Sequence, residues 1–173
     1  MKMTPASSPI AVVEGSDSDH VQQLLADAAA RWRAGGARVA GVTARSRNLP
    51  GQVCRAGELR DVSSGRRFSI YLETAPQGTS CHVDAGGVKT ACEAVIDDIA
   101  ASDLIVLSKF GKLEAAGQGL FMAFQAAITA GKPLLTSVSA RHRSAWSALV
   151  PVSALLPADT RALDVWWRAQ SRP

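Results

Sequence analysis

The chain has 173 residues, of which 47% are hydrophobic, 5% aromatic and 20% charged, and its formal net charge is +4. This length fits one domain with a sizeable core, because single cores usually span about 100–200 residues. The basic excess consists largely of scattered arginines without an interleaved aromatic stripe, which excludes the usual pattern of a nucleic-acid-binding surface, so we expect no nucleic-acid partner.

The chain opens with a polar segment, residues 1–9, that we expect to be a disordered tail, and we expect residues 10–173 to form one domain. The first apolar run, Ile10–Val13, stops at Glu14 and is too short for a signal-peptide core or a membrane span. We therefore expect a cytoplasmic protein without a membrane partner.

The first elements predict a βαβ unit. They are a strand over Ile10–Glu14, a loop over Gly15–Asp19, a helix over His20–Ala34 and a strand over Val39–Thr43. Asp17 or Asp19 is expected to cap the helix, since a short acidic side chain accepts hydrogen bonds from the first free amides.

The middle of the chain predicts a β-hairpin followed by a helix. Residues 45–57 show no periodicity and are expected to form a loop. The hairpin strands are Glu58–Val62 and Arg67–Glu73, and the second of them alternates apolar and polar side chains. After a loop over residues 74–87, apolar residues at helical spacing predict a helix over Val88–Ala101.

The last third continues the alternation of strands and helices. The predicted elements are a strand over Leu104–Leu107, a loop over Ser108–Gly119, a helix over Leu120–Ala130, a strand over Leu134–Val138, and two short helices around a strand over Val152–Leu156. Trp166 and Trp167 cannot face the same way on a helix. We expect one ring to pack on the body and the other to contact a partner subunit, which makes a homodimer a candidate assembly.

The three cysteines, Cys54, Cys81 and Cys92, form no CxxC pair. Their spacing argues against a zinc ribbon and a disulfide framework and favours a reducing compartment. Cys92 lies on the apolar face of its helix and is expected to fill the core. Cys81 lies in a loop beside His82, where a reactive thiol is the alternative to a structural role.

Strands that alternate with helices imply an α/β fold with a mainly parallel sheet covered on both faces. In such sheets ligands bind beyond the carboxyl ends of the strands. Three predicted loops meet there, Gly15–Asp19, Ser108–Gly119 and Ser137–Arg143, and they define the predicted site.

The first loop is the place for a phosphate-binding GxxxxGK[ST] pattern, but the match is degenerate. Gly15 fits its first position, whereas His20, Val21 and Gln22 stand where the second glycine, the lysine and the hydroxyl residue belong. The carboxylates of this loop would also repel a triphosphate. The alternative to a helix cap, a metal site from Asp17, Asp19 and His20, is kept open.

The segment Asp103–Glu114, with the sequence DLIVLSKFGKLE, resembles the small nucleoside triphosphatases first described in thermophiles. In those enzymes an apolar strand ends in an acidic pair that is followed by Ile-Gly-Lys-Met-Glu. The resemblance extends over residues 10–140 and includes the hairpin residues Gly65 to Phe68. It implies a three-layer P-loop NTPase-like sheet with helices on both faces and a β-hairpin insertion.

A second resemblance is to a bacterial domain family of unknown function that is often encoded beside molybdate-transport genes. It is carried by Ser80–Asp84, with the sequence SCHVD, and by Lys109–Gly119, with the sequence KFGKLEAAGQG. The usual pattern of that family has arginine where this chain has His82. The resemblance implies a link to molybdate or tungstate homeostasis.

The departure from the triphosphatase pattern lies at the end of the strand Leu104–Leu107, where Ser108 and Lys109 replace the acidic pair. In a triphosphatase these carboxylates hold Mg²⁺ and orient the attacking water. With a lysine there, and none in the first loop, we expect no competent Mg²⁺-dependent hydrolysis. We assign no catalytic residue, no resident metal and no cofactor.

The remaining polar and glycine residues predict an anion site instead. Lys109 and Lys112 supply charge, Glu114 is expected to orient one of them, and Gly117 and Gly119 allow the backbone to approach a ligand. The complete set of predicted ligand-binding residues is Gly15, Ser16, Ser80, Cys81, His82, Lys109, Lys112, Glu114, Gly117 and Gly119.

Three functions are compatible with this sequence. The first is a non-catalytic protein that binds a small anion, such as molybdate, tungstate or phosphate, or a nucleotide phosphate. The second is a residual nucleotide phosphatase. The third is an interaction or regulatory module that uses the fold as a scaffold.

Overall fold

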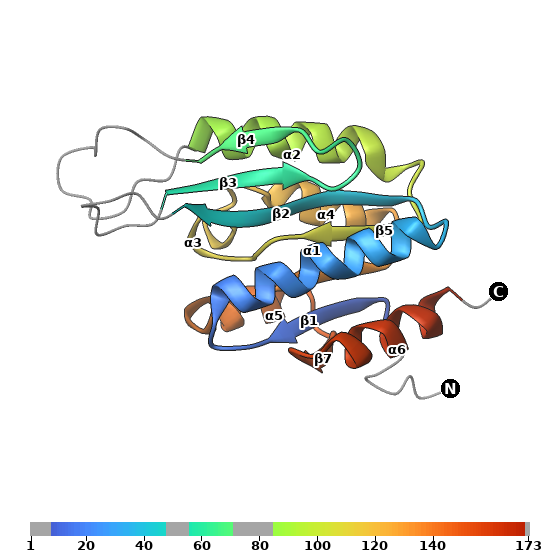
Figure 1. The fold of residues 1–173 in the computed structure, drawn as a ribbon. Helices are drawn as coiled ribbons and strands as arrows, with labels where there is room; N and C mark the ends of the chain where they lie inside the picture. Colours follow the sequence, from blue (N-terminus) through green and yellow to red (C-terminus); the bar gives the residue numbers. More distant parts are fainter. Residues whose placement is uncertain (1–7, 48–55, 71–84, 172–173) are drawn as a thin grey trace.

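A computed structural model describes residues 8–47, 56–70 and 85–171 as helices packed on both faces of a seven-stranded sheet (Figure 1). The strands are β1 (Ile10–Glu14), β2 (Val39–Arg47), β3 (Ala56–Asp61), β4 (Arg67–Ser69), β5 (Leu104–Leu107), β6 (Leu134–Ser137) and β7 (Ala154–Pro157). The helices are α1 (Ser18–Ala34), α2 (Ala85–Ile99), α3 (Lys112–Ala115), α4 (Phe121–Thr129), η2 (Ala140–His142), α5 (Arg143–Leu149) and α6 (Thr160–Gln170).

The sheet has the order β4-β3-β2-β5-β6-β1-β7. The five strands from β2 to β7 in this order are parallel, and β3 and β4 extend one edge as an antiparallel hairpin. The predicted α/β class, with a mainly parallel sheet and a hairpin, is therefore confirmed. β1 lies inside the sheet between β6 and β7, although it comes first in the chain.

Two hydrophobic cores cover the two faces of the sheet. One face packs against α1 and α6, and the other against α2, α4 and α5 (Figure 1). On the first face Trp32 of α1 lies between the rings of Trp166 and Trp167, with centroid distances of 6.3 and 5.6 Å. Trp166 is 2% exposed and packs on the body, as expected for one of the two rings, whereas Trp167 is half-buried. The contact of the second ring with a partner subunit stays a prediction.

Several element boundaries differ from the sequence prediction. β2 continues through Arg47, where a loop was expected, because residues 45–47 pair with β3. Helix α2 begins at Ala85, inside the expected loop, and the short helix α3 interrupts the loop over Ser108–Gly119. The predictions for Cys54, Ser80, Cys81 and His82 lie outside the described residues.

The amino end of α1 is capped as predicted. Asp17 is the N-cap residue, and its Oδ1 accepts a hydrogen bond from the backbone N–H of His20 at 3.1 Å. A cap of this kind contributes about 1 kcal/mol. Asp17 therefore has a structural role that accounts for its position in the first loop.

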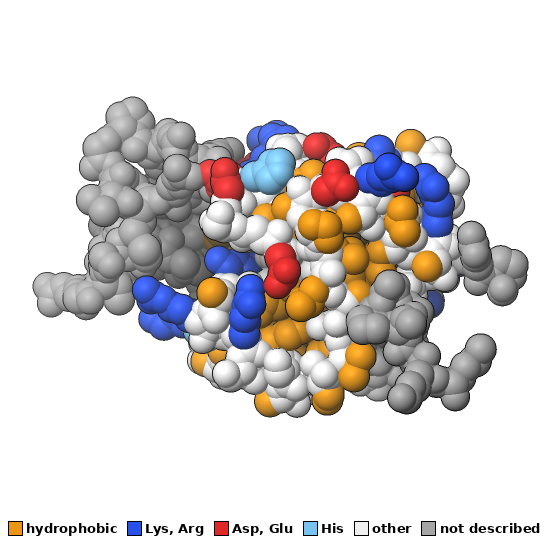
Figure 2. Space-filling model, turned by 90° about the horizontal axis from the view of Figure 1, so that it is seen from below, with side chains coloured by type: hydrophobic (Ala, Val, Ile, Leu, Met, Phe, Trp, Pro, Cys, Tyr) orange, Lys and Arg blue, Asp and Glu red, His pale blue; other side chains and the backbone are white. Residues whose placement is uncertain are grey.

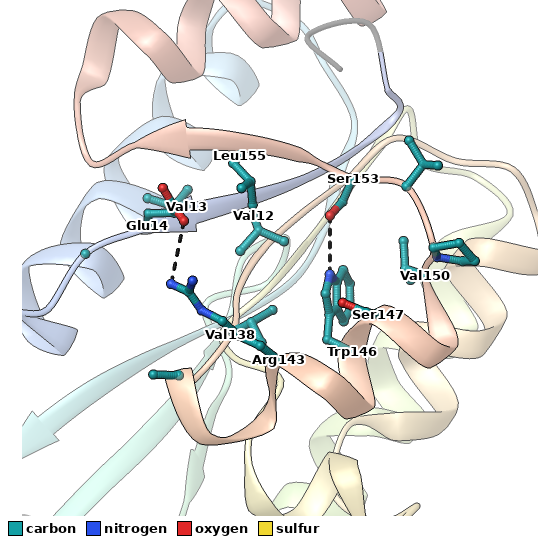
Figure 3. A pocket seen from close by; sticks show the side chains of 14 residues that line it. Val12, Val13, Glu14, Val138, Arg143, Trp146, Ser147, Val150, Ser153 and Leu155 are labelled. Atoms are coloured by element: carbon teal, nitrogen blue, oxygen red, sulfur yellow. Dashed lines mark hydrogen bonds and ion pairs between the residues drawn. The ribbon is translucent and has the colours of Figure 1, made fainter. Parts of the chain in front are cut away.

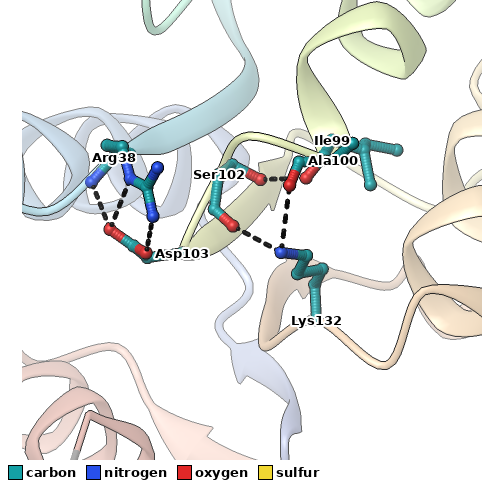
Figure 4. A network of polar contacts seen from close by, with 6 residues as sticks. All are labelled: Arg38, Ile99, Ala100, Ser102, Asp103 and Lys132. Carbon is teal, nitrogen blue, oxygen red and sulfur yellow. Dashed lines mark hydrogen bonds and ion pairs between the residues drawn. The ribbon is translucent and has the colours of Figure 1, made fainter.

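At the amino ends of the parallel strands, a polar network ties β2 to β5 (Figure 4). Arg38 donates to both carboxylate oxygens of Asp103, and the hydrogen bond from Arg38 lowers the pKa of that carboxyl below its ordinary value. Lys132, in the turn before β6, donates to the backbone oxygens of Ser102 and Ala100 at 2.8 and 3.3 Å. The polar groups at this end thus satisfy one another.

Among the described residues, no helix is both long enough and apolar enough to cross a membrane.

The close approach of β2 to β5 depends on Gly41. Its φ is +134°, which side-chain-bearing residues rarely adopt, and a Cβ there would overlap the backbone oxygen of Val106 on β5. Since β5 is completely buried in the middle of the sheet, neither strand can move away without opening both cores.

We expect Gly41→Ala to lower the free energy of unfolding by about 3 kcal/mol, because overlap and backbone strain add. Urea denaturation measures this change. Gly35→Ala is the matched control, since Gly35 has φ −80° and the nearest atom to its added Cβ would be 3.5 Å away. Equal stabilities of the two variants would contradict the assignment of Gly41 as a packing glycine.

Candidate functional site

The candidate site is the region at the carboxyl ends of β1, β6 and β5, which we call the crevice because open parallel sheets bind ligands in a crevice at this position. The helix after β1 packs on one face of the sheet, whereas the helix after β6 packs on the other. The two connections therefore diverge between adjacent strands, which is the arrangement that creates a ligand crevice in open parallel sheets. The three loops that the sequence placed together begin at these strand ends.

A buried glutamine of α1 joins the strand ends beneath this crevice. Nε2 of Gln22 donates to the backbone oxygen of Ser108 at 2.7 Å and lies 3.5 Å from Oγ of Ser137. Oε1 of Gln22 accepts from the backbone N–H of Ala44 at 3.0 Å. Pairing of β2 with β5 stops at Val42. The glutamine amide thus satisfies the N–H of Ala44 two residues beyond the last strand pair.

The loops after β5 and β6 are bonded to each other. Oγ of Ser137 donates to the backbone oxygen of Ser108 at 2.7 Å. Phe110 donates its N–H to the backbone oxygen of Ser137, and Ser139 donates to that of Phe110. An isolated parallel bridge between Phe110 and Val138 continues the sheet past its last full strand pair. The floor of the crevice is therefore a rigid part of the sheet.

Glu114 has a different partner from the one predicted. Its side chain is buried, Oε2 accepts the backbone N–H of Gly111 at 3.0 Å, and Oε1 accepts that of Leu120 at 3.0 Å. No ion pair joins it to Lys109 or Lys112 in the described part of the chain. The carboxylate thus binds the amides that open α3 and α4, and it fixes the loop that carries the two lysines.

The two predicted glycines of this loop have positive φ for different reasons. A Cβ on Gly119, at φ +62°, would lie 2.5 Å from Oε1 of Glu114. Gly117, at φ +76°, has open space around its missing side chain. Gly119 is therefore required by the packing of Glu114, whereas Gly117 leaves the loop open toward solvent.

Cationic side chains surround the crevice on the β5 and β6 sides. Lys109, Lys112 and Arg141 are exposed, and none of them has a carboxylate within 4 Å among the described residues. Nη2 of Arg143 lies 3.6 Å from Oε1 of Glu14, at the end of β1. The positive charges at this edge are thus largely available to an anion from solution.

A cavity of about 430 Å³ adjoins the crevice on the α5 face of β1 and β7 (Figure 3). At its polar end Arg143 reaches Glu14, and at the other end Trp146 donates to Oγ of Ser153 at 3.4 Å. Its walls are both apolar and polar, and Figure 2 shows apolar side chains exposed over this part of the molecule. Among them Val152 and Leu155 are 62% and 61% exposed.

The remaining predicted residues are placed as follows. Gly15 and Ser16 form an exposed turn between β1 and α1, at the mouth of the crevice, and Gly15 also lines the cavity. The alternative metal site beside this turn is not formed, because no group of three or more His, Cys, Asp or Glu side chains suited to a metal ion occurs within residues 8–47, 56–70 and 85–171.

Cys92 is a core residue, as predicted. It is 4% exposed in the cluster that packs α2 against α4. Burial raises the pKa of its thiol above the ordinary value, which favours the unreactive protonated form.

Sequence reasoning missed Gln22 as a structural residue of the site. The available signal was a glutamine beside the apolar stripe of an amphipathic helix, about one turn after the helix begins. Such a position is buried in the structure, with 7% of the residue exposed. A buried amide needs partners for both its donor and its acceptor, and only the strand ends supply them here.

Comparison with known proteins gives one family and one relative. Residues 10–166 match the family described as "Protein of unknown function (DUF2478)". A protein of Bradyrhizobium diazoefficiens named "Molybdenum import ATP-binding protein ModC 2" is 34% identical over 166 residues, which make up 94% of this chain and 18% of that protein. The chain thus spans less than a fifth of the length of this relative. No solved structure matches.

We expect Gln22→Leu to lower the free energy of unfolding by about 1–3 kcal/mol, because it leaves the N–H of Ala44 buried without an acceptor. The neighbour Gln23 is exposed and makes only an i,i+4 hydrogen bond to Asp27, so Gln23→Leu should change stability by about 0.5 kcal/mol or less. Chemical denaturation compares the two variants.

Gln22→Glu keeps the shape but replaces the donor with an acceptor at neutral pH. Its carboxylate would face the backbone oxygen of Ser108, so the loss of stability should be larger at pH 7 than at pH 4, where the protonated acid donates again. A loss that does not depend on pH would show that the amide donor is not what holds Ser108.

Proposed function

The chain belongs to the family described as "Protein of unknown function (DUF2478)", and we propose that it is a non-catalytic binding protein for a small oxyanion or for the phosphate of a nucleotide. The observation that carries this proposal is the cationic edge of the crevice. Lys109 and Lys112 project from a loop that Glu114 holds by its backbone, and neither ammonium has a carboxylate partner among the described residues.

The position of this edge in the fold supports binding. Free lysines are common on protein surfaces, but these two follow β5, the strand next to β6, and the connections after β6 and β1 diverge to opposite faces of the parallel sheet. The turn Gly15–Ser16 opens the same crevice from β1, directly before the amino end of the 17-residue helix α1. Asp17 already accepts the N–H of His20 at this helix start, and its carboxylate opposes an anion, so the attraction comes from the lysines of the facing loop.

A P-loop-like ancestry accounts for the architecture. β1 lies inside the sheet, and its loop leads directly into α1, which is where a phosphate-binding loop belongs. Gln22 stands at the position of the hydroxyl residue that binds Mg²⁺ in that pattern, and its amide donates to the backbone of Ser108 at the end of β5. A neutral donor thus occupies the place between α1 and β5 where the resemblance expects a cation.

The replacement of metal-binding residues by Gln22 and Lys109 explains why we propose binding without hydrolysis. Phosphoryl transfer depends on metal and cationic groups that stabilise charge in the transition state. The residues that follow β5 are Ser108 and Lys109, so no carboxylate is available there to coordinate a metal or to orient water. The site keeps attraction for an anion and lacks the groups that would activate a nucleophile.

The relative's name guides the choice of probes. It names molybdenum import and ATP binding for that protein. The cavity beside the crevice has both apolar and polar walls and is large enough for the organic part of a nucleotide. Molybdate and tungstate would use the cationic edge alone, whereas a nucleotide would use the edge and the cavity together.

We expect calorimetric titration of the full chain to show saturable binding of at least one of molybdate, tungstate, phosphate and ATP. Lys109→Ala should weaken it about tenfold, since a charge-assisted contact contributes about 1.5 kcal/mol or more. The affinity should also fall with rising salt concentration.

Lys89→Ala is the matched control, because Lys89 is equally exposed but lies on α2, away from the crevice. It should leave the affinity unchanged. No heat with any of the four anions would refute the proposal, and equal losses in the two variants would reduce it to a general charge effect.

We expect no release of phosphate from ATP or GTP above the buffer rate, with or without Mg²⁺. A sensitive phosphate assay checks this, with Lys109→Ala and Lys112→Ala as companion samples. Hydrolysis that disappears in either variant would establish the residual phosphatase instead. Hydrolysis that is insensitive to both changes would identify a contaminating enzyme.

A further inference from the structure

A second cationic surface lies on the α1 side of the hairpin edge of the sheet. Figure 1 shows α1 and α6 in front of the other strands, whereas β3 and β4 have no helix on that side. The opposite face of the hairpin is covered, since Leu59 and Phe68 belong to the core with α2. The side chains that alternate with these two residues therefore point toward the uncovered face.

Strand register places three arginines on this face. Arg60 of β3 lies opposite Thr43 of β2 and opposite Arg67 of β4. In the next row Arg45 lies opposite Glu58. Directly opposed like charges destabilise a sheet, so the pair of Arg60 and Arg67 requires a negative charge nearby.

Glu58 supplies a negative charge beside this pair. Its Oε1 lies 3.8 Å from Nη2 of Arg60 and 3.9 Å from Nε of Arg67. Nε of Arg60 is buried and donates to no acceptor among the described residues. The guanidinium group of Arg60 therefore keeps a donor that a ligand could use.

Two of these arginines line a cleft of about 420 Å³ between α1 and the hairpin. Ala26 and Ala30 form its helix wall and leave room for a ligand. The other charged groups of the cleft are Arg33, Asp27 and Asp61.

These three groups make hydrogen bonds to uncharged partners and keep their charges. Arg33 donates to the backbone oxygens of Val62 and Ser63, and Asp27 accepts from Gln23. Oδ1 of Asp61 accepts from Ser63 and Ser64 in the turn after β3. The arginines of the cleft that donate no hydrogen bond among the described residues are Arg45 and Arg60.

We propose that this cleft binds the phosphate group of a small phosphorylated molecule through Arg45 and Arg60. A guanidinium group presents paired donors that match phosphate oxygens, and the three arginines of the lining outnumber its two aspartates. The volume suits a small molecule. The lining residues include no aromatic side chain on which a base could stack, which disfavours a single-stranded nucleic acid. The site is separate from the crevice and does not depend on Lys109 or Lys112.

The test follows backbone amide signals of the full chain by NMR during titration with inorganic phosphate and with glycerol 3-phosphate. We expect saturable shifts at Thr43, Arg45, Arg60 and Ser63. These shifts should persist in the double variant Lys109→Ala/Lys112→Ala. In Arg45→Gln/Arg60→Gln the dissociation constant should rise at least tenfold, while acetate, with one charge, should bind the wild type more weakly than phosphate.

Arg168→Gln is the matched control, since Arg168 is exposed on α6, outside the cleft. It should bind as the wild type does. Absence of saturable shifts in the cleft of the wild type would overturn the proposal even if the arginine variants fail to fold. An affinity that is unchanged in a folded Arg45→Gln/Arg60→Gln variant would overturn it as well. If the lysine variant loses shifts at Ser108–Gly119 and keeps those in the cleft, the result supports two separate sites.

Discussion

The structure depends on one buried side-chain amide at the carboxyl ends of the central strands. Gln22 accepts a hydrogen bond from the N–H of Ala44, in the part of β2 beyond its pairing with β5, and donates one to the carbonyl of Ser108 after β5. Parallel strands leave polar groups without partners wherever one strand ends before its neighbour, and burial makes such groups costly. A single side chain from α1 satisfies both groups, so the helix and the strand ends are held in one geometry.

This fixed floor lets the charged groups above it stay free. Glu114 acts in the same way on the loop after β5, because its carboxylate binds the N–H groups of Gly111 and Leu120 rather than a lysine. The loop therefore keeps its shape without using Lys109 or Lys112. Charges that are not needed for folding can be presented to a ligand, and the rigid backbone beneath them lowers the entropy lost on binding.

Much of the fold was predictable because its signals are local. Continuous apolar runs such as Leu104–Leu107 identify buried strands, and the acidic cap of α1 was visible as Asp17. The strand order, the role of Gln22 and the partners of Glu114 were not predictable, since each depends on residues far apart in the chain. Gln22 and Ser108, for example, are separated by 86 positions. From the sequence alone, Gln22 was placed only at the hydroxyl position of the degenerate phosphate-binding pattern.

The arginines of β2, β3 and β4 were interpreted as scattered surface charge because their proximity also depends on residues far apart in the chain. In the sequence Arg45, Arg60 and Arg67 are spread over 23 positions, and each is unremarkable by itself. Antiparallel register brings them onto one uncovered face around Glu58. An isolated solvated arginine gains little from a neighbouring acid, but converging guanidinium groups raise one another's electrostatic energy until a counter-charge arrives. Nε of Arg60 has no acceptor among the described residues, so this face has more to gain from an anion than scattered arginines would.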